Sequence, residues 1–174
     1  MKIGIDFDNT IVNTSVVSKM FLDKYCPGNN LNSYHDLSKN EELKFFYKYY
    51  KDITKNLKVY DGVHEAFDFF KENNIEITLL TARGGGYPEI IDLTKEYLKE
   101  HNLNFDKYIF KAFPKGMEAK LYGLDLVIDD THEVVMDVRN HNIDALEYGV
   151  DVKSWYEVIE YVRKELYGKN NRCK

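Results

Sequence analysis

The chain begins with a short apolar run that ends on two carboxylates. Residues 2–5 are apolar after Lys2 and include two β-branched isoleucines, which is typical of a buried strand. Asp6 and Asp8 follow, and because residues i and i+2 of a strand point to the same side, both are expected to converge where the strand leaves the sheet. Two like charges held this close need a cation, a shared proton or a reaction to perform.

A divalent cation is the simplest partner for this pair of acids. Mg²⁺ takes oxygen ligands and commonly binds together with a phosphate group. Asn9 supports such a site, because Asn tolerates a left-handed backbone that turns the chain sharply and presents amide N–H groups to an anion. The alternative is an ordinary turn, since Asp, Asn and Thr also form turns and helix caps. The rest of the chain has to decide between them.

Length and composition limit the class of protein. A chain of 174 residues with 44% apolar residues can bury the core of one domain, or of one domain with a modest insertion. The net charge of -5 argues against a long nucleic acid as partner. The sequence opens on a strand, without a basic leader or an apolar run that could cross a bilayer, so we expect a soluble, cytoplasmic protein with no membrane partner. The spacing of Cys26 and Cys173 indicates neither a zinc site nor a disulfide framework.

The hydrophobic pattern alternates between strands and helices. Helices are expected at 13–25, 33–57 (with possible interruptions), 63–73, 88–101, from about 114, at 131–140 and at 152–166, and strands at 75–80, 108–110, 124–128 and 143–147. Such alternation predicts an α/β fold with a mostly parallel sheet covered by helices on both faces.

In parallel sheets of this kind, ligands bind beyond the carboxyl ends of the strands. The first strand ends on Asp6 and Asp8, the strand at 75–80 ends on Thr81, and the strand at 124–128 ends on Asp129 and Asp130. We therefore expect all of these side chains at one edge of the sheet, around a single crevice. The alternative is three unrelated turns.

A phosphate in that crevice would need a permanent positive charge. Lys111, Lys115 and Lys120 lie between the predicted strands at 108–110 and 124–128. The helix there begins at the crevice and descends away from it, so Lys120 is expected one turn or more deeper than Lys115. Lys115 is the preferred candidate and Lys111 the reserve, whereas a lysine chosen blindly is usually a solvated surface residue.

These residues, in this order, resemble the four motifs of the haloacid dehalogenase (HAD) superfamily of phosphatases: Asp6-Phe7-Asp8-Asn9-Thr10, Thr81, Lys115 and Asp129-Asp130. The resemblance covers most of the chain and implies a Rossmann-like parallel sheet with helices on both faces. It also implies a small helical cap at residues 13–60, inserted after the first strand into a core of residues 1–12 and 61–168, with a flexible tail at 169–174. Many members have Gly where this chain has Asn9, and the lysine motif is the loosest match.

The resemblance also implies a role for each matching residue. Asp6 would be the nucleophile that forms an aspartyl-phosphate, and Asp8 would protonate the leaving group and then activate water. Thr81 and Lys115 would bind the non-bridging phosphate oxygens. The Mg²⁺ ligands would be Asp6, the backbone carbonyl of Asp8 and Asp129, with Asp130 bound directly or through another group.

The runs Thr81-Ala82-Arg83 and Asn104-Phe105-Asp106 look like the deoxyribonucleotidase-like branch of that superfamily. This narrower resemblance suggests a nucleoside monophosphate as the small phosphorylated substrate. The residues predicted to contact it are Asn9, Thr10, Ala82, Arg83, Phe45 and Tyr49, with Phe46 and Tyr50 as further aromatic candidates. For most of the aromatics we favour ordinary core packing.

Other functions stay open on the sequence alone. A phosphatase of polynucleotide ends would share the motifs, although the acidic balance counts against it. A phosphatase of another small metabolite, a phosphotransferase such as a phosphomutase, and a non-catalytic module that binds Mg²⁺ or phosphate are further alternatives. The last of these would normally lack one of the two acids Asp6 and Asp8. The sequence leaves the base, the sugar and the oligomeric state undetermined.

Overall fold

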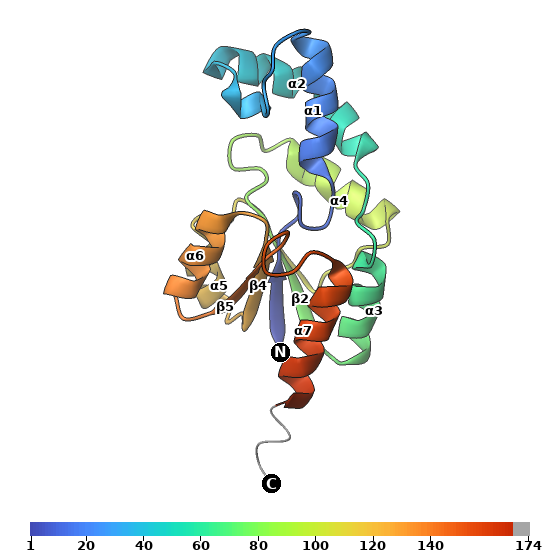
Figure 1. The fold of residues 1–174 in the computed structure, drawn as a ribbon, viewed down its shortest axis with the longest axis vertical. Helices are drawn as coiled ribbons and strands as arrows, with labels where there is room; N and C mark the ends of the chain where they lie inside the picture. Colours follow the sequence, from blue (N-terminus) through green and yellow to red (C-terminus); the bar gives the residue numbers. More distant parts are fainter. Residues whose placement is uncertain (169–174) are drawn as a thin grey trace.

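A computed structural model, which describes residues 1–168, shows a five-stranded parallel sheet with helices on both faces (Figure 1). This is the predicted fold class. The strands lie in the order β3-β2-β1-β4-β5. Their bounds are β1 (Lys2–Ile5), β2 (Glu76–Leu80), β3 (Lys107–Ile109), β4 (Leu126–Asp129) and β5 (Asp144–Glu147).

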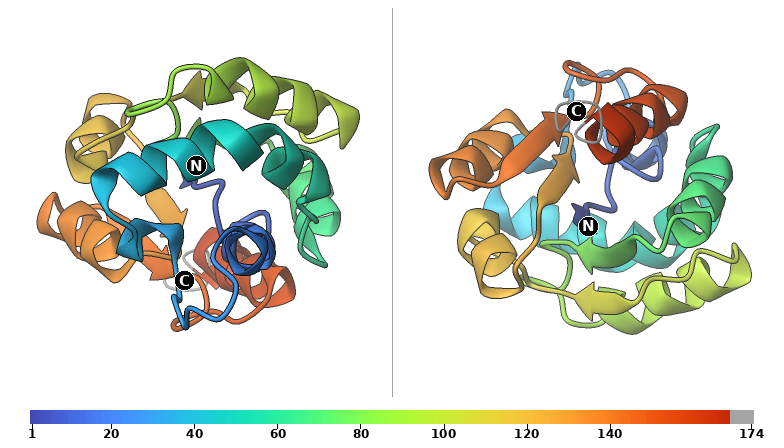
Figure 2. Two further views of the ribbon diagram at one scale, coloured as in Figure 1. Left: turned by 90° about the horizontal axis from the view of Figure 1, so that it is seen from above. Right: turned by 90° about the horizontal axis from the view of Figure 1, so that it is seen from below.

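The helices divide between the two faces of the sheet. Helices α3, α4 and α7 cover one face and α5 and α6 cover the other (Figure 2). The bounds are α1 (Thr14–Tyr25), the 3₁₀ helix η1 (Tyr34–Asp36), α2 (Lys39–Asn56), α3 (Val63–Glu72), α4 (Ile90–Glu100), α5 (Lys115–Leu121), α6 (His132–Asn140) and α7 (Trp155–Gly168).

Strand β1 is the centre of the sheet because it pairs with β2 on one side and β4 on the other. Ile3 and Ile5 are fully buried, and Ile5 pairs with Leu79 and Ile128. A strand covered on both faces needs a continuous apolar run, which is why β1 could be recognised in the sequence although it is short.

The inserted segment, residues 13–60, carries α1, η1 and α2 and lies above the carboxyl ends of the strands (Figure 1). Its two connections to the rest of the chain run side by side. Val12 and Val59 form an antiparallel bridge, and the Asn13 Oδ1 accepts a hydrogen bond of 2.7 Å from the Lys58 backbone N–H. The paired connections fix where the segment leaves and rejoins the sheet; its status as a separate cap stays a prediction.

Several element boundaries differ from the expected ones. The helical stretch expected at 33–57 is two elements, because Ser33 and Asp36 form a capping box around η1 and the Ser38 hydroxyl then caps α2. The last helix begins at Trp155 rather than at Val152, since the Ser154 hydroxyl accepts a hydrogen bond from the Glu157 N–H at 3.3 Å. The predicted tail at 169–174 lies outside the described residues. Within residues 1–168, no helix is long and apolar enough to cross a membrane.

Candidate active site

The structure places three strand ends next to one another at the carboxyl edge of the sheet. Asp6 follows β1, Thr81 follows β2 and Asp129 ends β4. Because β1 lies between β2 and β4, the three side chains are neighbours, and all three are buried. Asn9 makes the sharp turn after β1 with a φ of 54°, the left-handed conformation that the sequence suggested.

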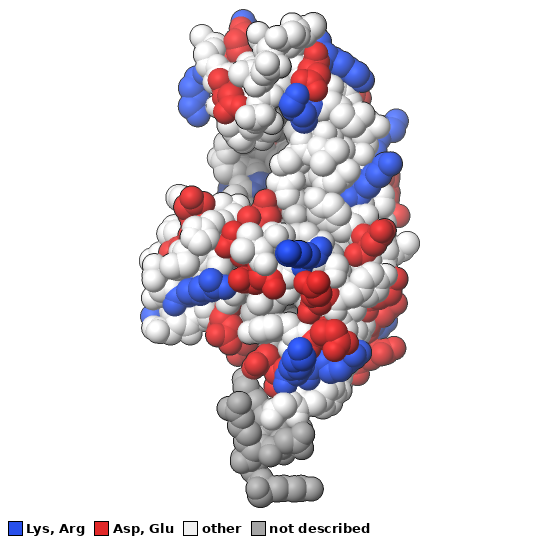
Figure 3. Space-filling view, in the orientation of Figure 1, with Lys and Arg blue, Asp and Glu red and all other residues white. Residues whose placement is uncertain are grey.

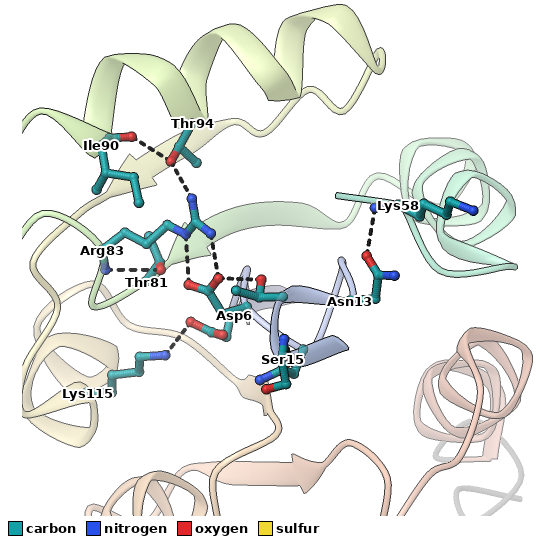
Figure 4. A network of polar contacts seen from close by, with 12 residues as sticks. Asp6, Asn13, Ser15, Lys58, Thr81, Arg83, Ile90, Thr94 and Lys115 are labelled. Carbon is teal, nitrogen blue, oxygen red and sulfur yellow. Dashed lines mark hydrogen bonds and ion pairs between the residues drawn. The ribbon is translucent and has the colours of Figure 1, made fainter. Parts of the chain in front are cut away.

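Lys115 connects two of these carboxylates. Its Nζ lies 2.6 Å from Asp6 Oδ1 (Figure 4) and 2.6 Å from Asp129 Oδ2, and its side chain is 5% exposed. Burial alone would lower the pKa of Lys115, but the two carboxylates outweigh it and raise that pKa. A buried ion triad is a poor source of stability because each charge loses its hydration. Its place at the crevice indicates a functional role.

Lys115 reaches the carboxylates because it is the first residue of α5, at the end of the helix nearest the crevice. Lys120 belongs to the last turn of the same helix and is exposed. Lys111 is also exposed and lies in a loop with a φ of 60°. Of the three candidate lysines, the structure therefore brings only Lys115 to the strand ends.

Asp8 is held by Arg83, which follows β2. The Arg83 Nε donates to Asp8 Oδ2 at 2.8 Å and Nη2 donates to Oδ1 at 2.6 Å, while the Thr14 hydroxyl donates to Oδ1 at 2.6 Å. The guanidinium also lies over the Phe7 ring, 4.3 Å from its centroid, and donates to the Thr94 hydroxyl. Burial would raise the pKa of Asp8, but Arg83 and Thr14 hold it below its usual value.

Asp6 behaves differently from Asp8. Burial raises its pKa to about 7; Lys115 opposes this shift, and the nearby charges of Asp129 and Asp8 add to it. The crevice thus holds one carboxylate that stays ionised and another whose proton affinity is unusually high. Such divergence is characteristic of sites that carry out acid–base or nucleophilic chemistry.

The charges at the crevice do not balance. Four carboxylates, those of Asp6, Asp8, Asp129 and Asp130, face two cations, those of Lys115 and Arg83. In the part of the chain that the structure describes, no three acidic, His or Cys side chains are clustered as a ready-made metal site. Mg²⁺ does not need one, because it usually binds through one or two carboxylates together with water and substrate phosphate. Oxygen donors with excess negative charge fit that ion.

The other predicted contact residues are placed unequally. Asn9, Ala82 and Asp130 line the cavity above the strand ends. Thr81 is largely buried but also lines the cavity, and its hydroxyl accepts a hydrogen bond of 3.3 Å from the Arg83 N–H. Thr10 is fully buried and does not line the cavity; its carbonyl accepts a hydrogen bond from Trp155 Nε1.

A cavity of about 550 Å³ extends from the strand ends into the inserted segment. The hollow between that segment and the rest of the molecule is visible in Figure 3, with acidic side chains along its lower rim. Its lower end is lined by Asp6, Asp8 and Lys115, and its upper walls are largely aromatic, with Tyr34, Phe45, Phe46, Tyr50 and Tyr87.

The aromatic residues expected to contact substrate lie in two different places. Phe45, Phe46 and Tyr50 line the cavity, but the structure does not bring Tyr49 there. Tyr49 packs inside the inserted segment, with ring centroids 5.3 Å from both Phe21 and Phe45. Helical spacing alone did not show which of Tyr49 and Tyr50 faces the cavity.

Two aromatic residues of the upper cavity wall, Tyr87 and Tyr34, were missed by the sequence reasoning. Tyr87 follows three glycines after β2, and its ring stacks on Phe46 at a centroid distance of 3.6 Å. Tyr34 lies on η1, and burial and the nearby charge of Asp8 raise its pKa to about 12. The Ser33–Asp36 capping motif beside Tyr34 was readable in the sequence, whereas nothing near Tyr87 marks its contact.

No protein-family model and no curated protein matches the sequence. Solved structures do match the fold. A predicted phosphatase from Clostridium acetobutylicum has a TM-score of 0.71 at 15% identity, covering 94% of this chain and 98% of that one. A β-phosphoglucomutase from Clostridium difficile has a TM-score of 0.66 at 16% identity, covering 97% of both chains.

A HAD-superfamily hydrolase from Ehrlichia chaffeensis matches with a TM-score of 0.60 at 18% identity, covering 94% of this chain and 96% of that one. These matches span nearly the whole of both partners in each comparison, the inserted segment included. The chain therefore has the α/β fold of the HAD-superfamily hydrolases.

Proposed function

We propose that the protein is a Mg²⁺-dependent phosphatase that hydrolyses nucleoside monophosphates through an aspartyl-phosphate. The contact that carries the proposal is the bridge from Lys115 Nζ to Asp6 and Asp129, 2.6 Å to each. It supports the proposal because Lys115 holds a fixed positive charge beside the carboxylate that we assign as nucleophile, at the edge where parallel sheets bind ligands. Asp8 and Thr81 supply the other groups that phosphoryl transfer requires at that edge.

In the first step, an Asp6 oxygen attacks phosphorus and the bond from phosphorus to the ester oxygen breaks, while Asp8 gives its proton to the departing oxygen. Asp8 is ionised in the free protein. A phosphate dianion brought beside it adds negative charge and so favours its protonated form. In the second step, Asp8 takes a proton from water, which attacks phosphorus and releases phosphate from Asp6.

The residues of the crevice that would hold Mg²⁺ are Asp6, Asp129 and Asp130, with the backbone carbonyl of Asp8. When bound, the ion neutralises part of the charge on the transferring phosphoryl group. Lys115 and the Thr81 hydroxyl would orient the non-bridging oxygens, and the buried position of Lys115 keeps that charge poorly screened by solvent.

The choice of a nucleotide rests on the cavity above the strand ends. Its volume of about 550 Å³ exceeds what a phosphate needs, and its walls carry aromatic rings from the inserted segment. Aromatic rings stack on nucleobases with little dependence on the base. We assign the inserted segment the role of a cap that selects the leaving group, while the strand ends bind the phosphoryl group of any monoester.

A panel of phosphate esters tests this function. Nucleoside 5′- and 3′-monophosphates, sugar phosphates and phenyl phosphate would be incubated with the protein, with Mg²⁺ or with EDTA, and phosphate release measured. We expect hydrolysis of nucleotides that EDTA abolishes and added Mg²⁺ restores. Full activity in metal-free buffer would refute the metal requirement, and hydrolysis or isomerisation of sugar phosphates without nucleotide turnover would refute the substrate class.

A further inference from the structure

Four buried side-chain oxygens have no hydrogen-bond partner within the described residues, and two of them belong to the cavity wall. These two are the hydroxyls of Ser18 on α1 and Thr54 on α2. Ser18 is 6% exposed and Thr54 is 2% exposed. Both belong to the inserted segment, whereas the other two, Thr10 and Thr78, do not line the cavity.

A helical Ser or Thr has a simple way to satisfy its hydroxyl, which is to donate to the carbonyl four residues earlier. Thr94 in α4 does this, with its hydroxyl 2.7 Å from the Ile90 oxygen. Ser18 and Thr54 make no such bond. Native proteins keep few unpaired buried polar groups, and each one calls for a cause. A ligand that supplies the missing partners would be such a cause.

The position of the two hydroxyls agrees with a ligand site. The residues that carry them, Ser18 and Thr54, line the same cavity as Asp6, Asp8 and Lys115, so one molecule can occupy both parts of it. Phe45, Phe46 and Tyr50 are on α2 with Thr54, so aromatic faces and an unpaired hydroxyl come from the same helix. Rotation about the Cα–Cβ bond redirects a hydroxyl, and a helical Thr uses two such rotamers.

We infer that Ser18 and Thr54 form the polar end of a leaving-group subsite, and that this subsite takes a planar heteroaromatic ring with hydrogen-bonding groups on its edge. A hydroxyl both donates and accepts, so the pair can bond to amino and carbonyl groups of such a ring. A ring without edge groups leaves the hydroxyls unpaired and is discriminated against. This inference rests on the proposed phosphatase function and deepens it.

The test compares two substrates on matched variants. Thr54→Val and Ser18→Ala remove one hydroxyl each, and Thr54→Ser retains it. The kcat/KM ratio of the preferred nucleoside monophosphate to phenyl phosphate, whose ring has no polar edge, should fall about tenfold or more in the first two variants and recover in the third. Thr78→Val, which removes an unpaired hydroxyl from β2 away from the cavity, should leave the ratio unchanged.

Melting temperatures separate this effect from damage to the fold. Removing an unpaired hydroxyl should not lower the melting temperature of Thr54→Val, since the group stabilises nothing in the free protein. An unchanged substrate ratio in both Thr54→Val and Ser18→Ala would overturn the inference. So would a ratio that falls equally in Thr78→Val.

Binding of nucleosides, which lack the phosphate, tests the subsite independently of the reaction. The parent should melt at a higher temperature with a saturating nucleoside, and Thr54→Val should show a smaller increase. If the parent hydrolyses no ester but this difference is present, the subsite stands and the proposed reaction fails. If the parent hydrolyses esters but nucleosides stabilise neither protein, the reaction stands and the subsite fails.

Discussion

Arg83 and Asp8 form a two-point ion pair, with Nε 2.8 Å from one carboxylate oxygen and Nη2 2.6 Å from the other. The sequence suggested that Arg83 would contact substrate. In the structure its third nitrogen, Nη1, donates to Thr94, and the guanidinium plane rests over Phe7. Each of the three nitrogens of Arg83 thus donates to a protein group. We propose that its role is to fix the direction of the Asp8 carboxylate.

Replacing Arg83 by Lys tests that role. Lys keeps the positive charge but cannot make a two-point contact, so the Asp8 carboxylate gains freedom to rotate. We expect kcat to fall by about tenfold or more while KM changes little, because a misdirected acid–base group affects the transition state more than binding. Steady-state kinetics on a nucleotide give both values. A higher KM at unchanged kcat would show that Arg83 binds the substrate after all.

The three candidate lysines between β3 and β4 differ in how close they lie to the strand ends. Lys115→Ala removes the only one of them that contacts Asp6 and Asp129, so activity should fall by about a hundredfold or more. Lys120→Ala on the same helix and Lys111→Ala in the preceding loop should stay near the parent value, since both side chains are exposed elsewhere. A crippling effect of either control would mean that the phosphate lies in a different place.

Asp6→Asn preserves the shape of the side chain and removes the attacking oxygen anion. Turnover should fall by several orders of magnitude, as loss of a covalent nucleophile does elsewhere. Asp144→Asn makes the same chemical change at an exposed position on β5, at the opposite edge of the sheet, and should leave turnover intact. Only a mild loss in Asp6→Asn would indicate that another residue attacks phosphorus.

The grouping of residues at the strand ends was predictable because it follows from the topology of the sheet. Once the sequence indicates a parallel sheet, the residues after each apolar strand must lie at one edge, which is where Asp6, Thr81 and Asp129 are found. The left-handed turn at Asn9 followed from the same local reasoning. These features depend on one strand and its neighbours and need no knowledge of side-chain packing.

Contacts between distant segments could not be predicted in this way. Arg83 and Asp8 are 75 positions apart, and nothing in either motif indicates that one pairs with the other. The stack of Tyr87 on Phe46 joins the loop after β2 to α2, and its formation depends on how the inserted segment sits over the sheet. Periodicity identifies the helix, whereas its rotation about its own axis comes from packing.

A pair formed by the exposed His132 and the buried Glu147 predicts a pH dependence of stability. The His132 Nδ1 lies 2.7 Å from Glu147 Oε2, and this hydrogen bond raises the pKa of His132 above its usual value of 6.5. A group whose pKa is higher in the folded than in the unfolded protein contributes its full stabilisation at pH values below the unfolded pKa. This contribution is lost as the pH rises through the folded pKa. His132→Gln should therefore lower the melting temperature slightly at pH 5.5 and less at pH 8.5. A larger loss at pH 8.5 would contradict this assignment.

Tyr49 and Tyr50 are adjacent on α2, but we predict different effects for their replacement. Tyr50 lines the cavity and stacks on Phe46 at a centroid distance of 5.2 Å, whereas Tyr49 packs against Phe21, Tyr25 and Phe45. Stacking of a base on an aromatic ring contributes about 1–3 kcal/mol, or roughly a ten- to hundredfold change in affinity. Tyr50→Ala should therefore raise KM for a nucleotide by about tenfold, and leave that for β-glycerol phosphate, which has no ring, nearly unchanged.

Tyr49→Ala should instead lower the melting temperature, because it removes packing between α1 and α2, and it should change the kinetics on both substrates to the same extent. The two variants together separate a stacking platform from a core residue. Equal losses on both substrates in Tyr50→Ala, accompanied by a lower melting temperature, would assign Tyr50 to packing as well. The nucleotide preference would then have to come from other rings of the cavity, of which Tyr34 is the next to replace, since it lines the cavity and stacks on Phe45.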